Sequence, residues 1–229
     1  MRKKALSENA SEPSTGPELQ KKRIVTIAAR LFARNGYAGT SVDDIAAEMG
    51  ATKGTVYHYF RSKQTLLYQA YVMSQVPLIA NLREIVAADD PPDQKFRKLI
   101  RTQIAILQAD PSVTSLLVAS QQLNGEFALP PAHRRVIRRN RKEYRQLIES
   151  ILNDGIEKGV FRPVDVPVVT KIIIAGYGWL VNWFKPRGRL GIDEVCDVIT
   201  DFFMSSLLAR PTATGLDDRQ LVGTASDAL

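Results

Sequence analysis

Four side chains within residues 53–60 have the types and spacing that contacts with duplex DNA require. Lys53 and Thr55, near the start of a predicted helix, are long enough to reach base edges, while the free N–H groups there attract phosphate. Tyr57 and His58 add rings with polar tips, which suit contacts with phosphate or a thymine methyl group. Because any one such residue is usually only solvated surface, the prediction of DNA binding depends on the whole set.

Capping residues predict the elements that would position these side chains. Ser41 caps a helix over 42–49, whose apolar residues recur at i, i+3, i+4 and i+7, and Gly50 can end it in a left-handed conformation. Thr52 caps the next helix and Ser62 a third. The side of the second helix turned to the core holds Val56 with Tyr59 or Phe60. Two short helices joined by a tight turn are the layout of a helix-turn-helix.

This stretch resembles the N-terminal DNA-binding domain of the TetR family of bacterial transcriptional regulators. The resemblance covers roughly residues 20 to 67 and is carried by L-F-A-R-N-G-Y-A-G-T-S-V-D-D-I-A and by A-T-K-G-T-V-Y-H-Y-F-R-S-K-Q-T-L-L. It implies DNA contacts at Thr40, Ser41, Lys53, Gly54, Thr55, Tyr57, His58, Tyr59 and Lys63. The sequence departs from the pattern at Asp43 and Asp44, where a basic residue can contact phosphate, so we expect these two to serve helix capping instead.

Composition is compatible with a DNA-binding protein and argues against several other classes. The 229 residues carry a formal charge of +7, and eight basic against four acidic residues lie between 17 and 64, which favours a polyanionic partner. A single cysteine excludes an internal disulfide or a multi-Cys metal site, and suits a cytoplasmic protein. The N-terminus lacks the apolar core of a signal peptide, and the most apolar run, 172–184, is too short to span a membrane.

The whole chain has helical periodicity, so we predict an all-α fold. Nine helices are expected, at 18–35, 42–49, 53–60, 63–87 with a kink or break at Pro77, 93–108, 111–123, 131 to near 155 or 159, 164–184 and 192–208. The predicted domains are a disordered tail at 1–16, the helix-turn-helix domain at 17–64, a ligand-binding and dimerisation bundle at 65–209, and a flexible tail at 210–229.

The C-terminal bundle contains residues that could bind a phosphorylated, partly apolar ligand. Arginines flank the apolar stripe of the helix after 131, although a solvated basic face or a surface near DNA explains them as well. The segment W-L-V-N-W-F-K-P-R-G-R-L-G-I-D-E-V resembles the same part of TetR-family members that respond to acyl-CoA thioesters, which implies an apolar tunnel with cationic groups for the CoA phosphates. The candidate ligand residues are Arg134, Arg138, Arg141, Arg145, Tyr144, Trp179, Trp183, Arg187 and Arg189.

DNA binding through one small helix-turn-helix predicts a symmetric dimer on a palindromic operator. The family resemblance implies that the last two helices of each subunit form a four-helix bundle, for which the candidates are Tyr177, Trp183, Val195, Ile199, Phe202 and Phe203. Each of these could equally be part of the core of its own chain.

We therefore predict a ligand-responsive bacterial regulator, most simply a repressor, that a small-molecule effector such as an acyl-CoA releases from its DNA. Two alternatives stay open: a multidrug-type regulator of an efflux pump that responds to lipophilic compounds, and a ligand-binding or interaction module without DNA binding. With two histidines, one cysteine and no spaced acid, base or metal-ligand set, the sequence predicts neither an enzyme nor a bound metal or cofactor.

Overall fold

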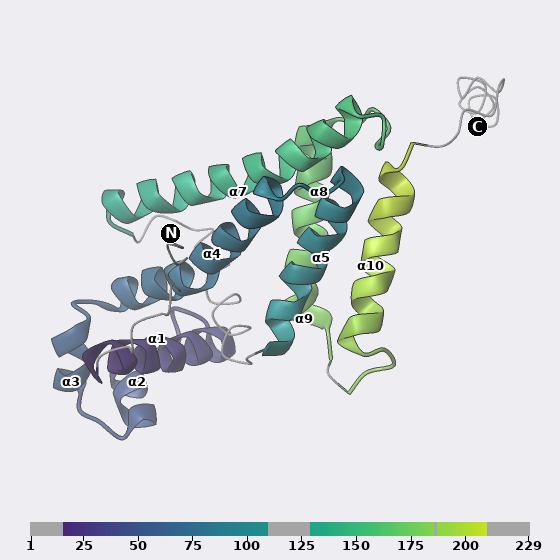
Figure 1. The fold of residues 1–229 in the computed structure, drawn as a ribbon. Coiled ribbons are helices and arrows are strands. Elements are labelled where there is room, and N and C mark those ends of the chain that lie inside the picture. Colours follow the sequence, from purple (N-terminus) through teal and green to yellow (C-terminus); the bar gives the residue numbers. More distant parts are fainter. Residues whose placement is uncertain (1–15, 110–128, 186, 210–229) are drawn as a thin grey trace, which may run out of the picture.

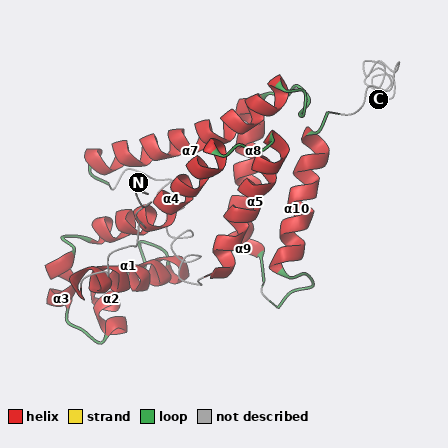
Figure 2. Ribbon diagram, viewed as in Figure 1, coloured by secondary structure: helices red, strands yellow, loops and turns green. Residues whose placement is uncertain are grey.

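The structure, a computed structural model, describes residues 16–109, 129–185 and 187–209. Within these ranges the secondary structure is helical (Figures 1 and 2), which confirms the predicted all-α fold, and one isolated β-bridge joins Phe161 to Leu208. The helices are α1 (Gly16–Asn35), α2 (Val42–Met49), α3 (Lys53–Tyr59), α4 (Lys63–Ala87), α5 (Pro92–Ala109), α7 (Pro131–Glu157), α8 (Val166–Gly178), α9 (Leu180–Trp183) and α10 (Ile192–Leu207). The predicted helix at 111–123 and the predicted tails lie outside the described residues, apart from Gly16 at the start of α1.

The first three helices and the start of α4 share one hydrophobic core. Ile24, Ala28 and Phe32 on α1 are fully buried, and Ile45 of α2 and Val56 of α3 pack into the same cluster. Gly36 and Gly50 adopt positive φ values of 76° and 66° at the ends of α1 and α2, where glycine avoids the strain of a side chain. Helix α1 thus forms the floor on which the two helices of the motif pack.

The long helix α4 connects this core to the rest of the chain. It starts within the first core at Leu66 and Leu67 and reaches the second core at Leu82, so it crosses the predicted domain boundary without interruption. A kink or a break was predicted at Pro77, and the helix continues through this residue without a break. Pro77 is exposed, whereas Leu78 and Ile79 beside it are buried, and their packing offsets the backbone hydrogen bond that proline cannot donate.

The second core is formed by the end of α4 together with α5, α7, α8 and α10. The helix predicted at 164–184 is in fact two helices, because α8 ends at Gly178 and the four-residue α9 follows it. Glycines at 176 and 178 disfavour a continuous helix, and the ring of Phe203 occupies the space beside Gly176, where an added Cβ would approach it to 2.8 Å.

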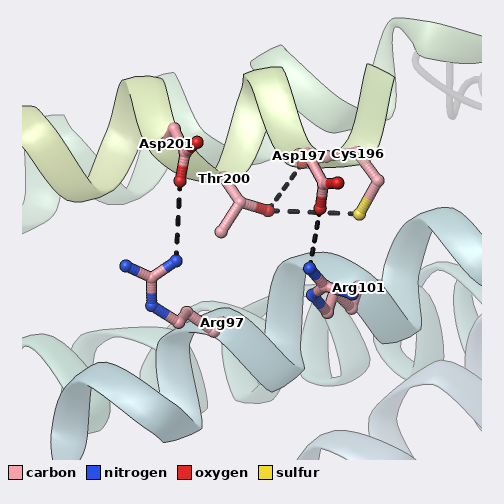
Figure 3. A network of polar contacts seen from close by, with 6 residues as sticks. All are labelled: Arg97, Arg101, Cys196, Asp197, Thr200 and Asp201. Carbon is pink, nitrogen blue, oxygen red and sulfur yellow. Dashed lines mark hydrogen bonds and ion pairs between the residues drawn. The ribbon is translucent and has the colours of Figure 1, made fainter. Parts of the chain in front are cut away.

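Two ion pairs join α10 to α5 (Figure 3). Arg101 lies 2.7 Å from Asp197, and Arg97 lies 3.6 Å from Asp201, one helical turn further along α10. On the adjacent face Thr200 is buried, and its hydroxyl donates to the Cys196 carbonyl at 2.7 Å. Among the exposed residues of α10 are two apolar ones, Val198 and Phe202, which are described below. In the ranges that the structure describes, no helix is both long and apolar enough to cross a membrane.

Candidate nucleic-acid interface

Helix α3 presents the predicted set of side chains because its apolar residues fix its rotation. Val56 is fully buried and Phe60, just after the helix, is 6% exposed. Thr52 caps the helix by accepting from the Thr55 N–H at 3.3 Å. Lys53 and Tyr57 are consequently exposed on the opposite side, as predicted.

The remaining predicted residues of α3 differ in exposure. His58 is exposed and its ring meets that of Tyr59 edge-on, at 5.0 Å between centroids. Tyr59 and Thr55 are half-buried, and the Thr55 hydroxyl is hydrogen-bonded to that of Thr52 at 3.0 Å. On helix α3, therefore, Lys53, Tyr57 and His58 are exposed to solvent, whereas Thr55 and Tyr59 are only partly accessible.

Gly54 has no visible structural role within the described chain. A Cβ at this position would meet only the Thr52 hydroxyl oxygen, at an ordinary contact distance of 3.6 Å. Glycine inside a helix costs about 1 kcal/mol relative to alanine. The missing side chain therefore suits the close approach of an external group to the start of α3, such as a phosphate.

The start of α2 confirms the predicted capping role of Asp44. The Ser41 N–H donates to the Asp44 carboxylate at 2.7 Å, and the Asp44 N–H donates to the Ser41 hydroxyl oxygen at 3.0 Å. The backbone hydrogen bond from Ser41 lowers the pKa of Asp44, and the side-chain hydrogen bond adds to this effect. Because Ser41 is exposed and its hydroxyl accepts, its hydroxyl proton can still be donated to a phosphate.

Asp43 lies in the first turn of α2, where a negative charge suits the helix start as predicted, and it also pairs with Lys53. Its carboxylate lies 2.7 Å from the Lys53 Nζ, and both side chains are at least half exposed. The hydrogen bond from Lys53 to Asp43, followed by their Coulomb attraction, raises the pKa of Lys53. The pair links the first turns of α2 and α3. It also means that Lys53, the main candidate for base contact, already has a counterion within the protein. The sequence indicated this ion pair, because an outward-facing acid lies at the start of one predicted helix and an outward-facing base at the start of the next.

Two other predicted contact residues face inward. Thr40 is 1% exposed, and its hydroxyl lies 3.2 Å from the Leu31 carbonyl and 2.9 Å from the Gly36 carbonyl, so this side chain is not at the surface. Lys63 donates from Nζ to the Tyr37 and Thr40 carbonyls, both at 2.8 Å. Lys63 thereby holds the α1–α2 turn against α4, and its Nζ also lies 4.2 Å from the centroid of the Tyr37 ring.

The structure does not gather the predicted ligand residues into one site. The arginines lie on α7, where Arg134 and Arg141 are half-buried and Arg138 and Arg145 exposed. Helix α9 lies at the end of α8 that is remote from the α7–α8 connection (Figure 1). The residues predicted there, Trp179, Trp183, Arg187 and Arg189, are all exposed. Tyr144 is the exception, because its hydroxyl is hydrogen-bonded inside the second core.

The predicted dimer residues divide into core and surface. Tyr177, Val195 and Phe203 are at most 8% exposed and belong to the second core of their own chain, so they are not available to a partner. Phe202 and Trp183 are 70% and 49% exposed, and Ile199 is half-buried. Other large apolar residues are exposed on the same helices. We define the α8–α10 apolar face as Val168, Ile172, Trp179, Trp183, Val198 and Phe202.

Comparisons with known proteins agree with this architecture. A family model described as "Bacterial regulatory proteins, tetR family" matches residues 24–70, and one described as "Tetracyclin repressor-like, C-terminal domain" matches residues 89–207. The HTH-type transcriptional repressor KstR2 of Mycobacterium tuberculosis is 31% identical over 173 residues, which are 75% of this chain and 84% of that protein.

Solved structures match over most of the chain. The TetR family transcriptional regulator PfmR from Thermus thermophilus has 29% identity and a TM-score of 0.72, covering 82% of this chain and 100% of its own. AibR, solved in complex with isovaleryl coenzyme A and operator DNA, has 26% identity and a TM-score of 0.70, covering 80% of this chain and 97% of its own.

Proposed function

Because the chain belongs to the TetR family of transcriptional regulators, we propose that it binds a palindromic operator as a homodimer and is released by a small-molecule effector. Its relatives are transcriptional repressors rather than enzymes, and we propose repression as its output. The main support for DNA binding is helix α3, which is capped at its start and exposes its polar side. This side includes Gly54, a glycine that the fold itself does not require.

The DNA contacts would come from both helices of the motif. Lys53, Tyr57 and His58 would enter the major groove from α3, with Thr55 and Tyr59 at its border. Ser41 would bind phosphate. Thr40 would contribute through the backbone alone, because its side chain is buried.

Dimerisation would use the α8–α10 apolar face. Phe202 is 70% exposed and Trp179 is 62% exposed, although large apolar side chains are more stable when they are removed from water. The two residues lie on neighbouring helices. A symmetric dimer would cover this face with its own copy and place two α3 helices on successive major grooves.

For the effector we propose an acyl-CoA thioester. AibR, a similar protein, was solved with isovaleryl coenzyme A and operator DNA together. In this chain the second core would receive the acyl group, while the α7 arginines Arg134, Arg138, Arg141 and Arg145 would bind CoA phosphates.

Contacts between α7 and α4 provide a route from effector to DNA. The rings of His133 on α7 and Tyr68 on α4 stack with centroids 3.9 Å apart, and the Tyr71 hydroxyl donates to the Ile137 carbonyl at 3.3 Å. A shift of α7 would therefore move α4 and, with it, the separation of the two α3 helices in the dimer. Such coupling requires an effector that binds the released state more tightly than the DNA-bound state.

Isovaleryl-CoA and longer acyl-CoA esters should release operator DNA from the protein. We expect saturating ester to weaken operator affinity at least about tenfold, a coupling of about 1.4 kcal/mol. Fluorescence anisotropy of a labelled operator measures the release, with free CoA as the control. Release by lipophilic dyes but by no CoA ester would instead support a multidrug-type regulator.

Asp43→Asn should increase binding to DNA that lacks the operator. Removing a carboxylate next to the phosphates frees Lys53 from its counterion, so affinity for random-sequence duplex should rise about fivefold, the equivalent of one modest charge interaction. Asp154→Asn on α7 is the matched control, since Asp154 also pairs with an exposed lysine, Lys158. A loss of affinity in the Asp43 variant would show instead that Asp43 orients Lys53 for binding.

A further inference from the structure

Three polar side chains from three helices meet inside the second core. Gln103 of α5 is 6% exposed and Tyr177 of α8 is 8% exposed, and Tyr144 of α7 lies between them. The Tyr144 hydroxyl is 2.8 Å from the Gln103 Oε1 and 2.5 Å from the Tyr177 hydroxyl. Buried polar groups in a largely apolar core need a reason, since apolar residues of similar volume would fill the same space.

The directions of these hydrogen bonds follow from the number of protons available. Tyr144 has one hydroxyl proton and donates it to the Gln103 Oε1. In the short contact between the two tyrosines, Tyr177 must therefore be the donor and Tyr144 the acceptor. In this arrangement the Gln103 oxygen accepts from Tyr144, and the amide nitrogen of Gln103 is on the other side of the amide group.

The amide nitrogen of Gln103 is what this network leaves unsatisfied. Among the described residues, Gln103 Nε2 is buried and has no hydrogen-bond partner. Such groups are rare in folded proteins because an unpaired buried donor loses its hydration without replacement. An oriented donor of this kind fits an acceptor atom supplied from outside the chain.

The chemistry of the cluster selects a neutral acceptor. Burial raises the pKa of both Tyr144 and Tyr177 far from neutrality, so both hydroxyls stay uncharged. Glutamine is also uncharged, and its neighbours one turn earlier on α5, Leu99 and Ile100, are fully buried. An uncharged donor among aliphatic side chains suits a carbonyl oxygen at the head of an apolar chain better than a carboxylate, which would need a cation.

We propose that Gln103, held by Tyr144 and Tyr177, binds the thioester carbonyl oxygen of an acyl-CoA effector. This inference rests on the proposed acyl-CoA response and adds the subsite that recognises the acyl end. It also gives a reason for coupling, because the bond to Gln103 is tied through Tyr144 to α7, the helix that contacts α4.

A pair of ligands that differ only at the carbonyl tests the proposal on the wild-type protein. Isothermal titration compares isovaleryl-CoA with its thioether analogue, in which a methylene replaces the carbonyl. The thioester should bind about tenfold more tightly, the usual effect of leaving a buried donor unpaired. Equal affinities would overturn the carbonyl subsite and leave the acyl-CoA response intact, whereas no binding of either ligand would overturn both.

Gln103→Met provides the second test. Methionine keeps the length of the side chain but has no N–H, so the preference for the thioester should fall to about onefold to twofold. Gln146→Met, at an exposed position on α7, is the matched control and should keep the tenfold preference. If Gln103→Met lowered the unfolding temperature but kept the preference, the glutamine would be structural only and the proposal would fail. The wild-type comparison decides the question even if this variant does not fold.

Discussion

Replacing Lys53 and Tyr57 together with alanine should weaken operator binding at least about 100-fold. Each good contact to a base edge contributes about 1–3 kcal/mol, and both side chains lie on the exposed side of α3. Losing one lysine contact should also make the salt dependence weaker. The steepness of the fall in the logarithm of the DNA-binding constant with the logarithm of salt concentration should decrease by about one. Fluorescence anisotropy over a range of salt concentrations measures both quantities.

Lys158→Ala is the matched control for this experiment. Lys158 is exposed and pairs with Asp154 at 2.9 Å, as Lys53 pairs with Asp43 at 2.7 Å, but it lies at the end of α7. The control should bind the operator like wild type. Unchanged binding by the Lys53/Tyr57 variant would mean that α3 is not the recognition helix, and it would favour an interaction module without DNA binding.

Phe202→Glu should convert the dimer to a monomer. Phe202 is the most exposed large apolar side chain of the α8–α10 apolar face, and a symmetric interface would contain it twice. Two lost aromatic contacts at about 2 kcal/mol each raise the dimer dissociation constant about 1000-fold. Sedimentation equilibrium measures the constant, and affinity for a palindromic duplex should fall with it.

The fold should survive this change, because the Phe202 side chain lies outside the core that contains Phe203. Ser150→Glu adds the same charge at an exposed position on α7 and serves as the control. A Phe202→Glu variant that remained dimeric would place the subunit interface elsewhere and leave the α8–α10 apolar face without its proposed partner.

Local rules in the sequence predicted the helix-turn-helix well. Ser41, Thr52 and Ser62 each cap the expected helix, and Gly50 ends α2 in the left-handed conformation. Capping and helical periodicity involve residues within about one turn of each other, so they are visible in the sequence. The inward position of Val56 then fixed the exposed side of α3.

Contacts between distant residues were beyond those rules. The sequence could not show that Thr40 turns inward to the Leu31 carbonyl, or that Tyr144 meets Tyr177 across two helices. On α10, apolar residues occur on more than one side, so periodicity alone did not distinguish Phe202 from Phe203. Phe203 is the buried one because Gly176 on α8 leaves room for its ring.

Selection of duplexes from a random pool by the purified protein tests whether a dimer recognises its operator through α3. A dimer that presents two α3 helices should enrich an inverted repeat, with half-site centres about one helical turn, or a multiple of it, apart. The Lys53/Tyr57 variant should enrich no sequence under the same conditions. Recovery of unrelated sequences by the wild-type protein, or of a single half-site without symmetry, would contradict a dimeric regulator that recognises its operator through α3.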